Sequence, residues 1–306
     1  MPVNKIILIF LIFLLIIVST SCYKNQGNPD EAAVSGTDTT GLDIATSIVP
    51  VGEFIKKIGG DKVNVTVMVP PGVDPHTYEP APRQLESLSG SHAYVMLGSG
   101  LGFELIWMDK IMSVNSDIYI IDCSEGIELL KSEYAEDGMG ENNETGLDPH
   151  IWLSPNNVKV ISKNIYEGLN KIDSINEKYY SQNLAYFLLE LDSLDEKIRE
   201  SLVNKNNKKF IVYHPAWSYF AKDYGLEQIP VEKEGKEPTA RELKNLINTA
   251  RENNIKVIFA SPQFNPKSAE VIASGIGGTV VFIDPLGADY VKNMETILES
   301  FKKYLQ

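Results

Sequence analysis

One long helical segment limits most strongly what this chain can fold into. Between residues 176 and 204, apolar side chains recur at steps of three and four, and no Gly or Pro interrupts the pattern. The apolar positions are Leu184, Phe187, Leu191, Leu194, Ile198 and Leu202. At 1.5 Å per residue this helix would be roughly 40 Å long, about the width of a small domain. The pattern also fits an ordinary surface helix, but candidate functional turns precede and follow it, so we expect a helix that links two lobes.

Short apolar strands alternate with helical patterns on both sides of this segment. An apolar run at 44–49 and strands at 63–69, 94–97 and 118–121 precede it, and strands at 210–213, 228–231, 255–260 and 279–283 follow it. This alternation predicts an α/β fold made of two (β/α) lobes with mainly parallel sheets.

The chain divides accordingly into three folded regions. We expect an N-terminal α/β lobe at residues 42–154, a helical region at 155–204 that includes the linking helix at about 176–204, and a C-terminal α/β lobe at 205–306. A chain of 306 residues is long enough for two domains that each have a core.

The first residues are typical of an export signal. Lys5 precedes an uninterrupted apolar run at residues 6–18, which suits a signal-peptide core and is short for a transmembrane span. Small residues directly before Cys22 resemble the site at which bacterial-type lipoproteins are cleaved and acylated. We therefore expect a signal peptide at 1–21, a lipid anchor on Cys22 and a disordered tether at 22–41, where apolar side chains are scarce. A cleaved soluble protein and an uncleaved anchor with a free Cys22 are the alternatives.

The charge of the chain indicates which partners it can attract. Lys and Arg number 28 against 41 Asp and Glu, which gives a formal net charge of −13. Such a surface attracts cations and repels nucleic acid, so we expect no nucleic-acid partner. Residues 132–146 form an acidic loop without His, which either gathers cations or is a solvated spacer. With only two Cys, no disulfide framework is expected.

Three of the four histidines and one aspartate are each adjacent to a proline in a turn. These residues are His76, His150, His214 and Asp284. Proline restrains the backbone of such a turn, and ligands bind off the carboxyl ends of the strands in open α/β sheets. Three imidazoles and a carboxylate suit a borderline divalent ion such as Zn²⁺, with Mn²⁺ also possible. A histidine beside a proline is often only a loop residue whose ring is hydrogen-bonded within the protein. Residue chemistry therefore leaves both roles open, that of a metal ligand and that of a structural loop residue.

Four other residues need a separate interpretation. His92 begins an apolar strand without a proline partner, and Cys123 follows a strand, so we expect both to be structural. Asp74 and Asp148 each precede a candidate ligand by two residues. They could orient an imidazole or cap a turn, and we favour the turns.

Three segments carry a resemblance to a known family. Residues 72–80 read GVDPHTYEP, residues 148–155 read DPHIWLSP and residues 284–288 read DPLGA. Together they resemble the signature segments of the cluster A-I substrate-binding proteins of metal-ion ABC transporters, and residues 261–264, SPQF, are also similar. The likeness extends from about Leu42 to the C-terminus.

The resemblance implies a fold and a ligand set. In that family two (β/α) lobes are joined by a long rigid helix, and the ion lies in the cleft between them. Carried over, His76 and His150 would be ligands from the first lobe, and His214 and Asp284 from the second. Manganese-specific relatives tend to have Glu where this chain has His214, which favours zinc. Zinc-type relatives often have a His-rich loop before the second ligand. In this chain the acidic loop occupies that place and contains no His.

Together these features predict an extracytoplasmic binding protein and not an enzyme. It would act as a monomer at the cell surface or in the periplasm, capture Zn²⁺ or alternatively Mn²⁺ as a transported ligand, and deliver it to an ABC permease with a separate ATPase subunit. A secreted zinc-dependent hydrolase is one alternative, although the sequence has no H-E-x-x-H and four protein ligands would close a tetrahedral site. A surface adhesin with a structural metal is another.

Overall fold

The computed structural model describes residues 41–132, 146–233 and 235–305. The predicted signal peptide, Cys22 and nearly all of the predicted tether and acidic loop lie outside the described residues. In the described ranges, no helix has both the length and the apolar character needed to cross a membrane.

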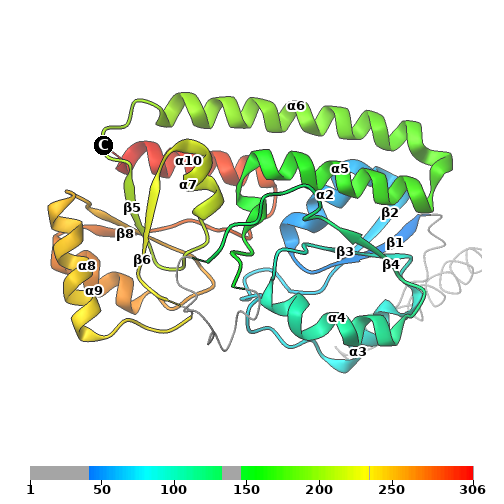
Figure 1. Ribbon diagram of the computed structural model, residues 1–306, viewed down its shortest axis with the longest axis horizontal. Coiled ribbons are helices and arrows are strands. Elements are labelled where there is room, and N and C mark those ends of the chain that lie inside the picture. Colours follow the sequence, from blue (N-terminus) through cyan, green and yellow to red (C-terminus); the bar gives the residue numbers. More distant parts are fainter. Residues whose placement is uncertain (1–40, 133–145, 234, 306) are drawn as a thin grey trace, which may run out of the picture. The chain divides into compact units, whose positions relative to one another are not determined.

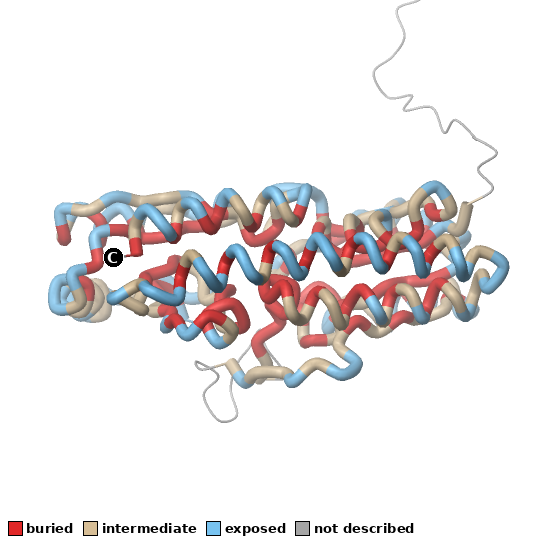
Figure 2. Tube along the Cα trace, turned by 90° about the horizontal axis from the view of Figure 1, so that it is seen from above, coloured by how far each residue is buried: buried red, intermediate tan, exposed pale blue. Residues whose placement is uncertain are grey.

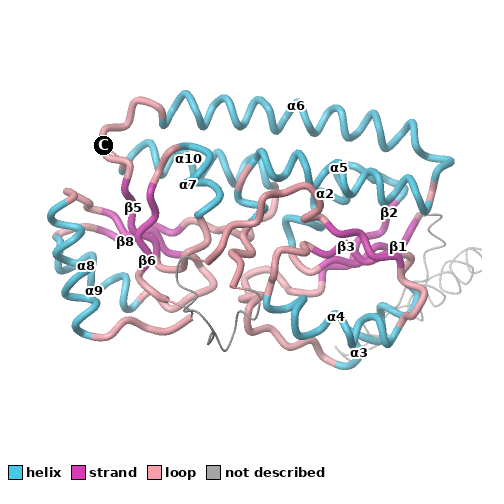
Figure 3. The backbone as a smooth tube through the Cα atoms, viewed as in Figure 1, coloured by secondary structure: helices cyan, strands magenta, loops and turns pink. Residues whose placement is uncertain are grey.

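Two four-stranded parallel sheets organise the chain, which confirms the predicted α/β class (Figure 3). The first sheet contains β1 (Leu42–Thr46), β2 (Val63–Val67), β3 (Ala93–Met96) and β4 (Tyr119–Asp122). The second contains β5 (Lys209–Val212), β6 (Glu227–Pro230), β7 (Val257–Ala260) and β8 (Thr279–Phe282). The strand orders are β2-β1-β3-β4 and β6-β5-β7-β8, so both sheets have the same topology although no repeat is evident in the sequence.

Helices cover both faces of each sheet (Figure 1). The α-helices of the described residues are α2 (Val49–Gly59), α3 (Pro82–Glu86), α4 (Gly102–Val114), α5 (Pro155–Ile172), α6 (Glu177–Leu202), α7 (Ser218–Tyr224), α8 (Ala240–Glu252), α9 (Lys267–Ile276) and α10 (Tyr290–Tyr304), and of these α6 lies on other helices and not on a sheet. Parallel neighbours require such crossovers, since a tight hairpin cannot return the chain in the same direction.

Helix α6 is the predicted long helix, and it buries the whole predicted apolar stripe. Figure 2, seen from the side of α6, shows buried and exposed positions alternating along it. The helix packs against α2 and α5 beside the first sheet and against α10 beside the second. Lys57 of α2 donates to Glu190 of α6 at 2.7 Å, and Lys197 of α6 donates to Glu295 of α10 at 2.7 Å. Helix α6 therefore contacts helices of both lobes, as a linking helix should.

Helix α10 makes a second connection between the lobes. The backbone N–H of Tyr290, at the start of α10, donates to Oε2 of Glu53 in α2 at 2.7 Å. The rings of Tyr290 and Phe54 meet edge to face, with centroids 5.0 Å apart. The Glu53 carboxylate thus accepts one of the N–H groups that a helix start leaves unpaired, across the lobe boundary.

Helix α9 has no counterpart among the sequence predictions, which left the segment between β7 and β8 unassigned. It buries Ala269, Ile272, Ala273 and Ile276 and ends at Gly277, whose φ is 61°. The buried positions follow helical spacing, but two of the four are alanines and the helix is short, which weakens the apolar signal. Parallel pairing of β7 with β8 requires a crossover here, and that pairing is a property of the tertiary structure.

Candidate metal centre

His76 lies in the loop that follows β2, and the start of α4 holds this loop in place. Oδ1 of Asp74 accepts a hydrogen bond from the backbone N of His76 at 2.9 Å, so Asp74 stabilises the turn as expected. The N–H of Phe103 donates to the carbonyl of Pro75 at 3.1 Å. A Cβ on Gly102 would lie 3.1 Å from the carbonyl oxygen of His76, closer than side chains usually pack. Gly102 therefore allows α4 to begin directly against the His76 loop.

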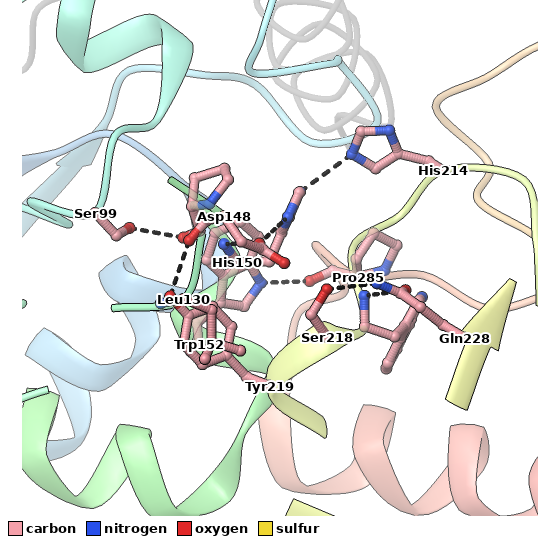
Figure 4. Close-up of polar contacts among 12 residues, drawn as sticks. Ser99, Leu130, Asp148, His150, Trp152, His214, Ser218, Tyr219, Gln228 and Pro285 are labelled. Atoms are coloured by element: carbon pink, nitrogen blue, oxygen red, sulfur yellow. Dashed lines mark hydrogen bonds and ion pairs between the residues drawn. The ribbon is translucent and has the colours of Figure 1, made fainter. Parts of the chain in front are cut away.

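His150 lies in a buried turn where Asp148 has two roles. Oδ1 of Asp148 accepts from the backbone N of His150 at 3.0 Å and contacts its Nδ1 at 2.8 Å. The carboxylate therefore stabilises the turn and also orients the imidazole, so the preference for the turn alone was incomplete. Ser99 donates to the carbonyl of Pro149 at 2.6 Å, and Trp152 donates its indole N–H to the carbonyl of Pro285 in the second lobe at 2.8 Å (Figure 4).

His214 lies two residues beyond β5, and a carboxylate that sequence reasoning did not consider binds it. Nδ1 of His214 is hydrogen-bonded to Oε1 of Glu232, a residue just beyond the neighbouring strand β6. The imidazole stacks on the ring of Phe264, with centroids 4.7 Å apart and planes 20° from parallel. No motif marks Glu232, and only the pairing of β5 with β6 brings it to His214.

The three imidazoles converge on one point. Among the described residues they form a group whose candidate ligand nitrogens all lie within 4.8 Å of one another. Nε2 of His150 and Nε2 of His214 are 3.1 Å apart (Figure 4). Two nitrogens at tetrahedral positions on one Zn²⁺, each about 2.05 Å from the ion, would be about 3.3 Å apart. The arrangement therefore has the dimensions of a small divalent cation site.

Asp284 lies two residues beyond β8, and its carboxylate is held by other groups. Oδ1 of Asp284 accepts from Nε2 of Gln263 at 2.7 Å and from the backbone N of Leu286 at 2.9 Å. Both bonds end on Oδ1 and neither uses Oδ2. In the part of the chain that the structure describes, Asp284 is not in the group of mutually close ligand atoms. The structure thus brings three of the four predicted residues together, and the role of Asp284 as the fourth ligand stays a prediction.

Burial sets the protonation of the site. Burial, together with the neighbouring imidazoles of His214 and His150, holds the pKa of His76 well below its ordinary value of 6.5. Burial also lowers the pKa of His150, although the Asp148 carboxylate acts in the opposite direction. For Asp148, burial raises the pKa, but the hydrogen bonds and charge of His150 and a hydrogen bond from Ser218 together outweigh it, and the pKa lies below its ordinary value. Neutral imidazoles beside an ionised carboxylate are the forms that bind a metal ion.

Two further residues have the structural roles that the sequence predicted. Nδ1 of His92 accepts a hydrogen bond from the backbone N of Asp43 at 3.0 Å. Cys123 is fully buried in the core of the first lobe.

A family model, curated relatives and solved structures all point to the same protein family. A family model described as zinc-uptake complex component A, periplasmic, matches residues 44–304. The high-affinity zinc uptake system protein ZnuA of Bacillus subtilis is 29% identical over 295 residues, which cover 91% of this chain and 92% of that protein. The manganese-binding lipoprotein MntA of Halalkalibacterium halodurans is 24% identical over 306 residues, which cover 98% and 96%. A crystal structure of ZnuA matches with a TM-score of 0.81 at 44% identity, covering 87% of this chain and 100% of that one.

Proposed function

The chain belongs to the family of the periplasmic zinc-uptake complex component A, and from this premise we propose that it captures a zinc ion outside the cytoplasm and delivers it to an ABC permease. Its relatives include both a zinc uptake protein and a manganese-binding lipoprotein. The family consists of substrate-binding proteins, so the ion is cargo that must be bound and then released.

The observation that carries this proposal is the convergence of His76, His150 and His214. One buried imidazole and two partly buried ones bring their candidate ligand nitrogens within 4.8 Å of one another, and lone pairs that converge on one point repel each other in the absence of a cation. A divalent ion satisfies all three lone pairs at once. It also neutralises the carboxylates of Asp148 and Glu232, which contact two of the rings.

We propose zinc as the preferred ion, because the site is rich in nitrogen. Imidazole ligands suit Zn²⁺, whereas carboxylate, carbonyl and water oxygens suit Mn²⁺. Asp284 is the proposed fourth ligand, and it would offer Oδ2 while Oδ1 keeps its bonds to Gln263 and Leu286. This set of three nitrogens and one oxygen would close a tetrahedral zinc site, which leaves no open position for catalysis.

The delivery step needs partners that are separate chains. We propose that the protein acts as a monomer, that Cys22 carries the lipid that keeps it at the membrane, and that a permease with its own ATPase subunit receives the ion. Residues 22–41 would then be the tether between the anchor and the first strand.

A competitive titration tests this function. Metal-stripped protein is titrated with Zn²⁺ and with Mn²⁺ against a calibrated chelator, with His150→Ala beside the wild type and His92→Ala as the matched control. We expect one tight zinc site that is lost in His150→Ala and retained in His92→Ala. Tighter binding of manganese than of zinc would support the transport function but overturn the assignment of zinc as the preferred ion. If neither ion binds tightly, the proposed metal site is refuted.

A further inference from the structure

The contact between Glu232 and His214 joins two loops that leave neighbouring strands. Glu232 follows β6, and its backbone N donates to the carbonyl of Tyr213 at 3.0 Å, while Val231 donates to Val212 at 2.8 Å. These bonds extend the pairing of β5 with β6 past the ends of both strands. The Glu232 residue is only 3% exposed, so its carboxylate is placed by rigid backbone and by burial.

This carboxylate determines which nitrogen of His214 carries the proton. A carboxylate accepts hydrogen bonds and cannot donate one while it is ionised. Nδ1 must therefore carry the proton of the neutral His214 ring, which leaves the lone pair on Nε2. Nε2 is the nitrogen that lies 3.1 Å from Nε2 of His150.

The same arrangement recurs on His150, where Asp148 binds Nδ1. With both Nδ1 atoms donating to carboxylates, the two Nε2 atoms face each other as lone pairs and cannot hydrogen-bond to each other. A cation placed between them relieves their repulsion. The two carboxylates thus prepare a pair of nitrogen ligands for a cation before it arrives.

We propose that Glu232 is a positioning residue of the metal centre, which fixes the tautomer and orientation of His214 so that Nε2 faces the ion. This inference rests on the proposed function, in which His214 is a ligand. Phe264 stacks on the face of the imidazole and restricts its tilt, but a stacked ring cannot distinguish Nδ1 from Nε2. Glu232 supplies that distinction. Loss of such an outer carboxylate reduces metal affinity about 10- to 100-fold.

The first test reads the tautomer in the metal-free protein. The ¹⁵N shifts of the histidine rings, assigned with a His214→Ala spectrum, show which nitrogen of His214 carries the proton. We expect Nδ1–H in the wild type and in Glu232→Gln, whose amide oxygen can still accept the bond. In Glu232→Met, which keeps the length of the side chain and removes the acceptor, we expect the proton to move to Nε2 or to exchange between both nitrogens. A wild-type His214 protonated on Nε2 would overturn the proposal without reference to any variant.

The second test measures zinc affinity in the same variants. We expect a loss of about 10- to 100-fold in Glu232→Met and a smaller loss in Glu232→Gln. Glu237→Gln is the matched control, because it removes a carboxylate in the same loop that binds Tyr213 and Ser268 instead of a candidate ligand. Unchanged zinc affinity in a folded Glu232→Met protein would overturn the proposal. If the wild type itself binds no zinc, the proposed function fails, whereas the tautomer in the metal-free protein still decides the role of Glu232.

Discussion

At the scale of single residues, the site is defined by what buries and contacts its imidazoles. His150 is buried and His76 is partly buried, and desolvation is the largest cause of the low pKa of each ring. A group whose pKa is lower in the folded state than in the unfolded state binds a proton less readily when the chain is folded. Acid therefore favours the unfolded chain, which binds the proton more readily.

This difference predicts how the stability of the metal-free protein depends on pH. The ordinary pKa of histidine is 6.5, and the pKa values of His76 and His150 in the folded protein are lower. As the pH falls below 6.5, these two histidines therefore bind protons in the unfolded state but remain neutral in the folded state. The free energy of unfolding should decrease as a result. Urea unfolding of chelator-treated protein at a series of pH values measures the slope.

A double variant, His76→Ala with His150→Ala, provides the control for this prediction, and it should flatten the slope below pH 6.5. Burial raises the pKa of the Glu104 and Glu53 carboxyl groups. At lower pH these two groups bind protons more readily in the folded state than in the unfolded state, so they increase the free energy of unfolding as the pH falls. An identical slope in the wild type and in the double variant would show that the two imidazoles do not control acid stability.

Asp284 allows a second prediction at this scale, since it can be a ligand or only a hydrogen-bond acceptor. If Oδ2 binds the ion, Asp284→Asn should weaken zinc binding by about 10-fold or more, because the amide is neutral and a poorer ligand. Cobalt absorption spectra of the wild type and the variant would also differ in that case.

Gln263→Met gives the comparison, because it removes one bond to the Asp284 carboxylate and keeps the carboxylate itself. We expect a smaller loss of zinc affinity than in Asp284→Asn. Equal affinity and equal cobalt spectra in Asp284→Asn and the wild type would limit Asp284 to a structural role in its turn.

At the scale of elements, α6 is stabilised by one buried stripe. Leu191 is 0% exposed in the middle of this stripe, whereas Leu189, two residues earlier on the same helix, is 65% exposed. Leu191→Ala should lower the free energy of unfolding by about 2–5 kcal/mol, because it removes buried methyl groups and leaves a cavity. Leu189→Ala should change it by about 0.5 kcal/mol or less. Denaturant unfolding of both variants checks this, and equal losses would mean that α6 is not packed as described.

The start of α4 gives another prediction, because Gly102 touches the backbone of His76. A Cβ there would be 3.1 Å from the carbonyl oxygen of His76, whereas a Cβ on Gly90 would meet no atom within 4 Å. We expect Gly102→Ala to displace the His76 loop, to lower stability by about 1–3 kcal/mol and to weaken zinc binding. Gly90→Ala should leave zinc binding unchanged. Thermal unfolding and zinc titration of both proteins provide the measurement, and wild-type zinc affinity in Gly102→Ala would show that the loop adapts.

At the scale of the whole folded region, several contacts hold the two lobes together. Helix α6 packs on α2 and α10, and Glu53 accepts from the first N–H of α10. On the side of the site, Trp152 donates to the carbonyl of Pro285, and the hydroxyl of Tyr219 donates to the carbonyl of Asp148 at 3.0 Å. A large hinge motion would break hydrogen bonds in both places at once.

These contacts predict that zinc binding changes the arrangement of the lobes only slightly. Small-angle scattering curves of the metal-free and zinc-loaded protein should nearly superimpose, since closure would have to separate α10 from α2 or Trp152 from Pro285. A clear decrease in the radius of gyration on zinc binding would contradict this expectation. Glu53→Gln serves as a comparison variant, because it weakens the hydrogen bond from the backbone N–H of Tyr290 in α10 to Glu53 in α2, one of the contacts between the lobes.

Much of the fold could be predicted because it depends on local patterns. The stripe of α6, the apolar strands and the capping box of Thr239 and Glu242 at α8 each depend on residues a few positions apart. The proline turns at His76, His150 and His214 are equally local. For this reason the local patterns could predict two α/β lobes and a linking helix, and they singled out the three histidines, whose role as ligands the family resemblance then implied.

The remaining features depend on which strands are neighbours, and local periodicity carries no information about that. Glu232 reaches His214 only because β6 pairs with β5, and Gln263 reaches Asp284 only because β7 pairs with β8. Helix α9 is required by the same pairing of β7 with β8. The sequence by itself thus determined most of the elements and the imidazoles, whereas the tertiary structure decided that Glu232 orients His214 and that α9 connects β7 with β8. The physical reason is that the order of strands in a sheet results from packing between distant segments.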